Sequence, residues 1–444
     1  MTKHCQIRPR LNYVVRVSEL DYFLEICKQT HSVSVLTADD VAEIVVRKRV
    51  KIEKERPAVS STRLYLPTLE KKIAQDYLRK GAVKDVLKLC TSWNLLVTGP
   101  NGKFEPSPIC REIGAFVSDE EIASAKNKLF HAIIASGMDR LFDPSRFLLK
   151  IRDNVVQDVI AVDRDRQHIR LKVPSEEGVA YDDERFVRDI MHTNPVSFTV
   201  ICDWAYFFNL LNFFIPTFEK TVKRPTKGIY PTKIIVSLKE VNDLIKLLSA
   251  EHHPIPKNLL IAQLGLTGYV GTCLVYIAEK LGLVIEENDN ISIVRRISDL
   301  SELIRLATGR GITVISDGKI RGIINKFDKE LENDTTYLIL EPQWPLEDFL
   351  ETLWECYYDL VDGKTFLFAS IFRLRETVCK ILRIHDDDFD EYVSRALVKY
   401  PSRLHLGLGS AETKHRLKAR RFQKPFNIHG RSYYVVKVTG DHVE

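Results

Sequence analysis

Three aspartates and a lysine lie close together in one stretch of the sequence and have the residue types of a metal-dependent nuclease site. Asp158, Asp163 and Asp165 precede Lys172 in the segment VQDVIAVDRDRQHIRLKV, residues 156–173. In such a site two carboxylates converge on one Mg²⁺, and a lysine steadies the attacking water or the transition state. However, Asp163 and Asp165 fall in the DRDR turn of a predicted hairpin, and alternating charge is typical of a solvated loop. We therefore assign no catalytic residue to this segment.

Other catalytic motifs are weaker still. The segment SDGK, residues 316–319, lacks the upstream glycine spacing of a phosphate-binding loop. The adjacent His252 and His253 have no H-E-x-x-H pattern around them. The nucleophile motif G-x-S-x-G does not occur. We therefore expect a non-enzymatic protein that uses no cofactor and no metal.

A run of basic residues near the C-terminus has the composition of a surface for a polyanion. Between Ala411 and Lys437 there is one acidic residue, Glu412, against eight cations. The cations are Lys414, Arg416, Lys418, Arg420, Arg421, Lys424, Arg431 and Lys437. The whole chain has a net charge of only +5, so a polyanion site has to arise from such clustering. A solvated tail is the alternative, but a well-patterned strand region follows the run and makes it a loop inside a domain.

Length and composition indicate an ordinary globular protein of two to four domains. The chain has 444 residues, of which 45% are hydrophobic and 28% charged. Its eight cysteines form no C-x-x-C pair, which favours a reduced intracellular protein. The N-terminal residues contain no apolar stretch of the kind that a signal peptide needs.

One apolar segment approaches the length of a membrane span. It is VSFTVICDWAYFFNLLNFFIP, residues 196–216, and it contains Asp203, Asn209 and Asn212. Polar groups in lipid are costly, so a buried helix is favoured over a transmembrane helix. We expect a cytoplasmic protein without membrane contact, associated with the nucleoid if the protein is prokaryotic.

The clearest structural unit runs from Ser237 to Val294. Ser237 and Glu240 form a capping box before a helix with one apolar face. A short helix is predicted over 257–264 and another over 268–281, ended by Gly265 and Gly282 respectively. Two β-like runs then flank a polar tip at residues 288–290, which predicts a hairpin.

The same order of elements is predicted twice more. In the first copy, helices over 68–79 and 82–93 precede a hairpin with Asn101 and Gly102 at its tip, followed by a helix over 118–135. In the last copy, helices over 346–360, from Ser370, and from Asp387 to Tyr400 precede strand regions at 404–409 and 426–438. The basic run lies between these two strand regions, where a wing would be.

Helix, short helix, helix and hairpin is the order of the winged helix-turn-helix, so the three units resemble the winged helix superfamily. The resemblance covers about half of the chain and implies a mainly α protein with small β-hairpins (α+β), built as a multi-domain array of winged-helix units. The expected domains are an N-terminal helical region (1–60), a winged-helix-like domain (61–140), a hairpin with an apolar helix and a basic linker (141–230), a winged-helix domain (231–297), a helix–hairpin connector (298–343) and a C-terminal winged-helix-like domain with a long basic wing (344–444).

The resemblance gives the basic residues of the first and last units a role in binding double-stranded DNA, mainly through phosphates. In the first unit these residues lie on or beside the predicted recognition helix and hairpin: Lys84, Lys88, Thr91 and Lys103. In the last unit, Arg395, Lys399 and Arg403 extend the surface of the basic run. The middle unit has Glu286, Glu287 and Asp289 on its hairpin, which would repel phosphate. We expect that unit to be structural or to bind protein.

These observations predict a DNA-binding protein, either a transcriptional regulator or the DNA-binding subunit of a larger defence or genome-maintenance complex. Two alternatives remain open. One is a protein-interaction scaffold, in which the winged helices and the apolar segment 196–216 contact protein partners or a second copy of the chain. The other is a nuclease that uses the carboxylates between residues 158 and 172.

Overall fold

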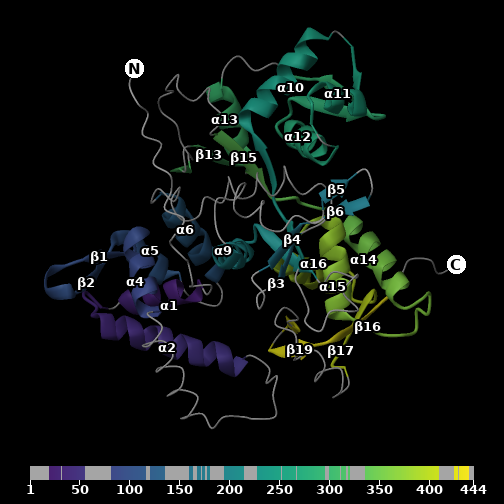
Figure 1. Cartoon of the computed structure of the whole chain (residues 1–444). Coiled ribbons are helices and arrows are strands. Elements are labelled where there is room, and N and C mark those ends of the chain that lie inside the picture. The colour runs from purple at the N-terminus through teal and green to yellow at the C-terminus, as the bar shows by residue number, and fades with distance from the viewer. Residues whose placement is uncertain are drawn as a thin grey trace, which may run out of the picture.

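The computed structural model describes residues 20–31, 33–55, 82–116, 121–135, 160–163, 168–171, 173–175, 178–180, 195–214, 228–251, 253–266, 268–295, 300–310, 312–316, 319–320, 336–409, 425–428 and 430–439. Over these residues the protein is a mixed α+β structure in which helices are joined by small antiparallel sheets. The predicted α+β class is confirmed. In Figure 1 the N-terminal helices lie at the left, residues 238–293 at the top and the C-terminal residues at the right.

The N-terminal unit combines helices from both sides of residue 60. Its elements are α1 (Asp21–Thr30), α2 (Ala38–Glu55), α4 (Ala82–Ser92), β1 (Leu96–Thr98), β2 (Phe104–Pro106), α5 (Pro108–Ala115) and α6 (Ile122–Ala135). Strand β2 pairs with β1, and on its other side Phe104 forms a β-bridge with Leu36, which lies between α1 and α2. Residues of α1 and α2 share one apolar core with those of α4, α5 and α6. The predicted helix over 68–79 lies outside the described residues.

Helices α1 and α5 approach each other unusually closely in this core. Gly114 of α5 faces the backbone of Cys27, and a Cβ atom built on Gly114 would lie 2.1 Å from the Cys27 carbonyl oxygen. One turn earlier on α5, the Sγ atom of Cys110 lies 3.2 Å from that of Cys27. The seven described cysteines are free thiols, and all of them are buried.

The middle unit has the three helices and the hairpin that the sequence predicts, and in addition a short strand, β10. They are α10 (Leu238–Ala250), β10 (Ile255–Pro256), α11 (Lys257–Gln263), α12 (Gly268–Lys280), β11 (Val284–Glu287) and β12 (Asn290–Ile293). Both hydrogen bonds of the predicted capping box are present between Ser237 and Glu240. The short strand β10 pairs with β12, so the strand order is β10-β12-β11.

The C-terminal unit repeats this order of elements. It contains α14 (Leu346–Leu360), β16 (Ala369–Ser370), α15 (Ile371–Leu382), α16 (Asp386–Lys399), β17 (Leu404–Gly407) and β20 (Val435–Val438). Its strand order, β16-β20-β17, matches that of the middle unit because the short first strand again pairs with the last. A second hairpin, β18 (Phe426–Ile428) with β19 (Arg431–Tyr433), is inserted before β20. The strand region predicted over 426–438 is therefore three strands.

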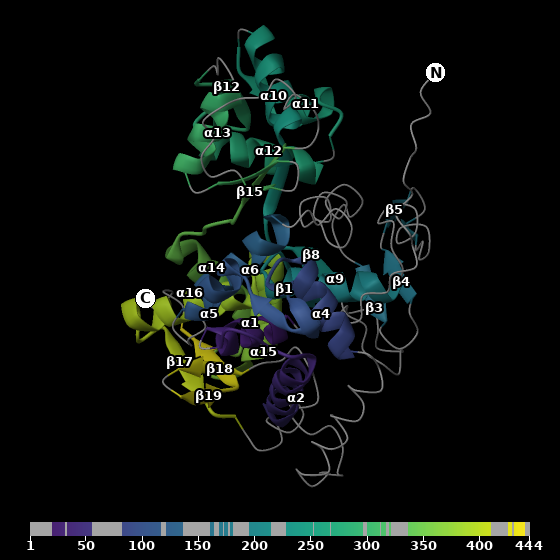
Figure 2. The same cartoon turned by 90° about the vertical axis from the view of Figure 1, so that its left-hand side faces the viewer.

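A central group of elements connects the three units. It comprises α9 (Pro195–Phe207), β7 (Leu211–Phe214), β8 (Gly228–Pro231), β9 (Ile234–Ser237), α13 (Leu300–Gly309), β13 (Thr313–Ser316), β14 (Lys319–Ile320) and β15 (Thr336–Leu340). Strands β9, β13, β14 and β15 form one sheet in the order β14-β13-β15-β9. In Figure 2 the middle unit stands above the rest of the molecule, and β15 runs down from it.

Two of the predicted hairpins are confirmed in this region. Strand β3 (Ile160–Asp163) pairs with β4 (His168–Leu171), and β13 pairs with β14. A further hairpin is formed by β5 (Val173–Ser175) and β6 (Gly178–Ala180).

In the apolar segment 196–216, the described side chains between residues 200 and 213 are buried or half-buried, but the prediction of a single helix is wrong. Helix α9 ends at Phe207, and Asn209 adopts a left-handed φ of 56°. This turn directs the chain into strand β7, which pairs with β8. Among the described residues, no helix is long and apolar enough to cross a membrane.

Candidate nucleic-acid interface

Helix α4 of the N-terminal unit presents two lysines to solvent. Val86, Leu89 and Cys90 are at most 1% exposed and face the core. Lys84 and Lys88 lie one turn apart on the opposite, exposed face. The helix is therefore amphipathic, and the two lysines on its polar face are spaced so that both can contact a phosphate backbone.

Thr91 is less available than the two lysines. It is half-buried, and its hydroxyl donates back to the helix, with the carbonyl oxygens of Leu87 and Lys88 at 3.1 and 3.0 Å. Only the acceptor side of this hydroxyl remains for a ligand.

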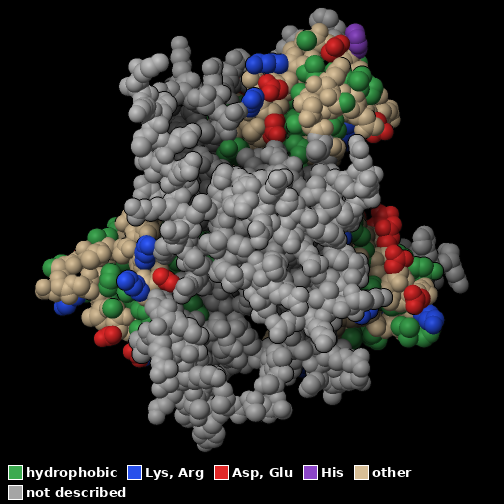
Figure 3. All heavy atoms as spheres, viewed as in Figure 1, with side chains coloured by type: hydrophobic (Ala, Val, Ile, Leu, Met, Phe, Trp, Pro, Cys, Tyr) green, Lys and Arg blue, Asp and Glu red, His purple; other side chains and the backbone are tan. Residues whose placement is uncertain are grey.

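The hairpin β1–β2 carries the fourth predicted residue of this unit, Lys103, at its exposed tip. The tip turns through Asn101 and Gly102, which have φ values of 61° and 70°. Next to Lys103, at the tip end of β2, Phe104 forms reciprocal backbone hydrogen bonds with Leu36, both 2.8 Å long. These bonds fix the backbone on one side of the tip. Figure 3 shows lysine and arginine side chains on this unit at the left of the view.

The corresponding helix of the middle unit, α12, exposes Thr272, Glu279 and Lys280 and buries its other face. Its residues Leu274, Val275 and Ile277 belong to the same core as Val236 of β9 and Leu338 of β15. The four-stranded sheet therefore packs against the helix that would have to enter a groove. On the neighbouring hairpin, Glu286 pairs with Lys257 at 2.8 Å, while Glu287 and Asp289 are exposed.

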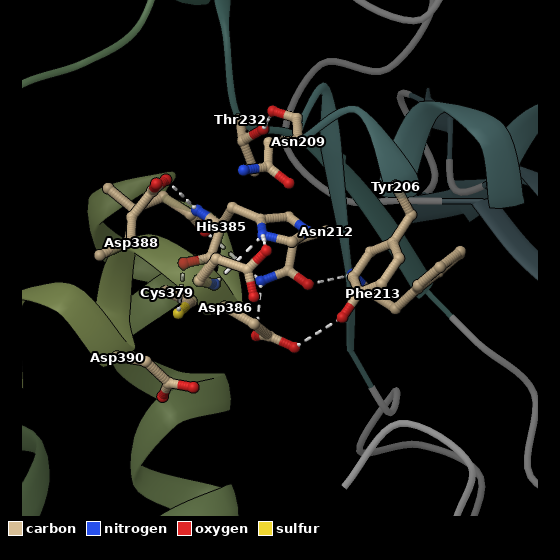
Figure 4. A network of polar contacts seen from close by, with 12 residues as sticks. Tyr206, Asn209, Asn212, Phe213, Thr232, Cys379, His385, Asp386, Asp388 and Asp390 are labelled. Atoms are coloured by element: carbon tan, nitrogen blue, oxygen red, sulfur yellow. Dashed lines mark hydrogen bonds and ion pairs between the residues drawn. The ribbon is translucent and has the colours of Figure 1, made fainter. Parts of the chain in front are cut away.

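The corresponding helix of the C-terminal unit, α16, has its first turn docked on the central elements. Asn212 of β7 is 1% exposed, and its side-chain amide donates to Asp386 Oδ1 at 2.9 Å. Tyr206 of α9 donates its hydroxyl to the other carboxylate oxygen at 3.1 Å. The same Asn212 amide lies 3.0 Å from the hydroxyl of Tyr230 in β8. Figure 4 shows this network, which joins α9, β7 and β8 to the start of α16.

The docked turn is further fixed by His385, the N-cap residue of α16. His385 is 2% exposed, and its ring packs 4.6 Å from that of Tyr206. Its backbone N–H donates to Asp388 Oδ2 at 2.9 Å, and its Nδ1 accepts from the Asp387 N–H at 3.2 Å. Burial, together with the nearby Asp386 carboxylate, raises the pKa of the Tyr206 phenol well above its usual value, so this hydroxyl stays a donor.

The cations predicted for the C-terminal unit are partly engaged within the unit. Lys399 donates to Glu347 of α14 at 2.6 Å, and this contact lowers the pKa of Glu347 to about 2. The guanidinium groups of Arg395 and Arg403 lie over the rings of Tyr392 and Tyr400, at 5.3 and 4.7 Å. Arg431 is exposed on β19. These residues do not converge with those of α4.

The remaining predicted residues of the basic run lie outside the described residues: Lys414, Arg416, Lys418, Arg420, Arg421 and Lys424. Of the four possible nuclease residues, the structure describes one, Asp163, which is the last residue of strand β3. The other three, Asp158, Asp165 and Lys172, lie outside the described residues. In the described part of the chain, no group of three or more histidine, cysteine or acidic residues is placed to hold a metal ion.

The buried network of Asn212 and Asp386 is not predicted by the sequence analysis. The one available signal is Asn212 itself, a polar residue inside an apolar segment, because a buried amide needs a partner. Its partner lies 174 residues further along the chain.

Comparison with protein-family models, with curated proteins and with solved structures finds no match to this chain.

The docked turn makes stability depend on pH through Asp388. Burial raises the pKa of this carboxyl to about 6, from an ordinary value of 3.8. The folded state therefore holds the proton more tightly, so this contribution to stability is fully present below about pH 4 and is lost as the pH rises through about 6. Asp388→Asn keeps an acceptor for the His385 N–H without the charge. We expect the variant to gain stability relative to the wild type as the pH rises from 4 to 7.

Urea denaturation at several pH values between 4 and 7 measures this difference. Asp348→Asn, at an exposed position of α14, is the control and should give a nearly constant difference. Parallel stability curves for Asp388→Asn and the wild type would contradict the assignment.

Proposed function

We propose that the protein binds double-stranded DNA without catalysing a reaction, and that it does so through α4 and the β1–β2 hairpin of its N-terminal unit. The proposal is supported by the threefold recurrence of one order of elements: helix, short strand or bridge, two helices and a hairpin. In each copy the short strand or bridge pairs with the last strand. This is the order of a winged helix-turn-helix, which places its last helix in the major groove and its wing beside the backbone.

The observation that carries the proposal is the difference between the three candidate recognition helices. Helix α4 exposes two cations, Lys84 and Lys88, on its outer face, whereas α12 exposes Glu279 beside Lys280 and the first turn of α16 is docked on Tyr206 and Asn212. A groove-binding helix needs an open face with cations for the phosphates. Among the described residues, α4 meets this requirement best.

In this proposal the middle and C-terminal units serve mainly as a scaffold. The first turn of α16 is docked on the central elements, and the middle hairpin exposes two acidic residues, Glu287 and Asp289, which would repel a phosphate backbone. The basic residues between Lys414 and Lys424 add phosphate contacts that do not depend on base sequence. Such a protein acts in the cytoplasm as a transcriptional regulator or as the DNA-binding subunit of a larger assembly.

Removing the three cations of the N-terminal surface tests the proposal. We expect the triple variant Lys84→Ala, Lys88→Ala and Lys103→Ala to bind a random 30-base-pair duplex at least ~10-fold more weakly than the wild type at 0.1 M salt. Fluorescence anisotropy of the labelled duplex gives the affinities. The matched control, Lys28→Ala, Lys246→Ala and Arg305→Ala, removes the same charge from other exposed sites. Equal losses in the two triple variants would mean that net charge, and not this surface, determines binding.

A further inference from the structure

The C-terminal unit exposes a short run of large apolar side chains. Phe366, Leu367 and Phe368 follow one another in the loop between α14 and β16, and they are 70%, 41% and 50% exposed. Single exposed apolar residues are common on protein surfaces, but contiguous ones mark sites of interaction. This surface is distant in sequence from the N-terminal unit, and the inference below does not rest on the proposed DNA binding.

The backbone of this loop is fixed by hydrogen bonds to a buried tyrosine. The hydroxyl of Tyr357, whose side chain is buried, lies 2.9 Å from the carbonyl oxygen of Thr365 and 2.6 Å from that of Leu367. Asp362 and Gly363 turn the chain with φ values of 50° and 73°. The exposed side chains are therefore presented by a fixed backbone, which lowers the entropy cost of binding a ligand.

A cavity of about 240 Å³ opens beside these side chains. Leu360, Leu367 and Phe368 contribute apolar walls, and Asp362, Lys364 and Arg373 contribute charged lining. The volume suits one aromatic or leucine side chain, and the lining combines apolar walls with polar and charged groups.

The cations of the cavity have no acidic partner among the described residues. Lys364 and Arg373 are both exposed, and neither forms an ion pair in the part of the chain that the structure describes. Ser370 also lines the cavity, and its hydroxyl oxygen is buried without a hydrogen-bond partner. Two cations, Lys364 and Arg373, outnumber the one carboxylate of the lining, Asp362, so the cavity is complementary to a carboxylate next to an apolar side chain.

We propose that this surface docks an acidic, apolar peptide segment of a partner protein. One aromatic or leucine side chain of the segment fills the cavity, and a neighbouring carboxylate binds Lys364 and Arg373. A short peptide contacts the cavity alone, whereas an extended anionic membrane would also lie against the adjoining helix α14, which exposes Glu351, Glu355 and Asp359 and contains no lysine or arginine. Figure 3 shows acidic side chains on the right of the view, and such carboxylates would repel a charged bilayer.

Anisotropy of three fluorescein-labelled peptides on the full-length protein tests the proposal. The probe has the sequence Ser-Gly-Asp-Leu-Phe-Asp-Asp-Gly. One control peptide has asparagine for each aspartate, and the other has serine for leucine and phenylalanine. We expect saturable binding of the probe and at least fivefold weaker binding of both control peptides. Arg373→Glu and Phe366→Ser should each weaken binding of the probe at least fivefold.

Two variants serve as matched controls. Lys246→Glu reverses an exposed cation of the middle unit, and Val398→Ser removes an apolar side chain that is 84% exposed on α16. Neither should change the affinity. No binding of the probe, equal binding of the three peptides, or binding that Arg373→Glu and Phe366→Ser leave unchanged would overturn the proposal. Sedimentation with phosphatidylserine vesicles that Phe366→Ser abolishes would also overturn it, in favour of a lipid surface.

Discussion

Gly114→Ala should cost the N-terminal unit about 3 kcal/mol or more of its free energy of unfolding. The added Cβ atom would lie 2.1 Å from the carbonyl oxygen of Cys27 and 2.8 Å from its carbonyl carbon. Both are backbone atoms of another helix, so no change of rotamer relieves the clash. Helices α1 and α5 would have to separate, which opens the core around Cys27, Cys110 and Ile113.

Gly268→Ala is the matched control for this substitution. Gly268 begins helix α12, and an added Cβ atom there meets nothing within 4 Å. Since alanine is the better helix former, the control should be neutral or slightly stabilising. Urea denaturation followed by tryptophan fluorescence compares the two variants, because Trp93 lies in the core that Gly114→Ala disturbs. Equal midpoints for Gly114→Ala and the wild type would contradict the close packing of α1 on α5.

Asn212→Asp should lower the free energy of unfolding by about 3 kcal/mol at neutral pH, because it weakens the contact between the central elements and the C-terminal unit. The substitution replaces the amide that donates to Asp386, at 2.9 Å, with a second carboxylate. Two buried carboxylates at this distance cannot both ionise, so one of them must take up a proton. The pKa of the pair in the folded state then lies above that of the unfolded chain, and the loss should grow as the pH rises from 5 to 8.

The free energy of unfolding at pH 5 and pH 8 measures this effect. Asn258→Asp makes the same change at an exposed position of α11 and should have little effect at either pH. If Asn212→Asp were as stable as this control at pH 8, the buried network of Figure 4 would not hold α16 in place.

The sequence predicts the middle unit well because its signals are local. Ser237 and Glu240 cap α10 through residues three apart, and Gly265 and Gly282 adopt left-handed φ values of 65° and 67° just after α11 and α12. Each of these signals acts within one turn of the helix that it begins or ends. The same holds for the tip of the β1–β2 hairpin, where Asn101 and Gly102 lie as expected.

The N-terminal unit is predicted less well because its organisation depends on a distant contact. The first winged-helix-like domain is predicted to begin at residue 61, whereas Leu36 bridges to Phe104, and α1 and α2 share the core of α4. A β-bridge between residues so far apart leaves no periodic pattern in either segment. Packing across the whole chain, and not local propensity, determines it.

In the candidate interface, too, features that depend on local sequence could be predicted, and features that depend on distant contacts could not. The exposure of Lys84 and Lys88 could be predicted from the helical spacing of Val86, Leu89 and Cys90. The packing of α12 against β9 and β15, and the docking of Asp386 on Asn212, could not be predicted, because both depend on contacts between separate parts of the fold.

The dependence of DNA affinity on salt tests the central proposal most directly. Each phosphate contact contributes about −0.9 to the slope of log affinity against log salt concentration. The triple variant of Lys84, Lys88 and Lys103 should therefore have a slope shallower than that of the wild type by about 3, while the control triple variant of Lys28, Lys246 and Arg305 keeps the wild-type slope. An unchanged slope in the first variant would contradict binding through α4 and the β1–β2 hairpin.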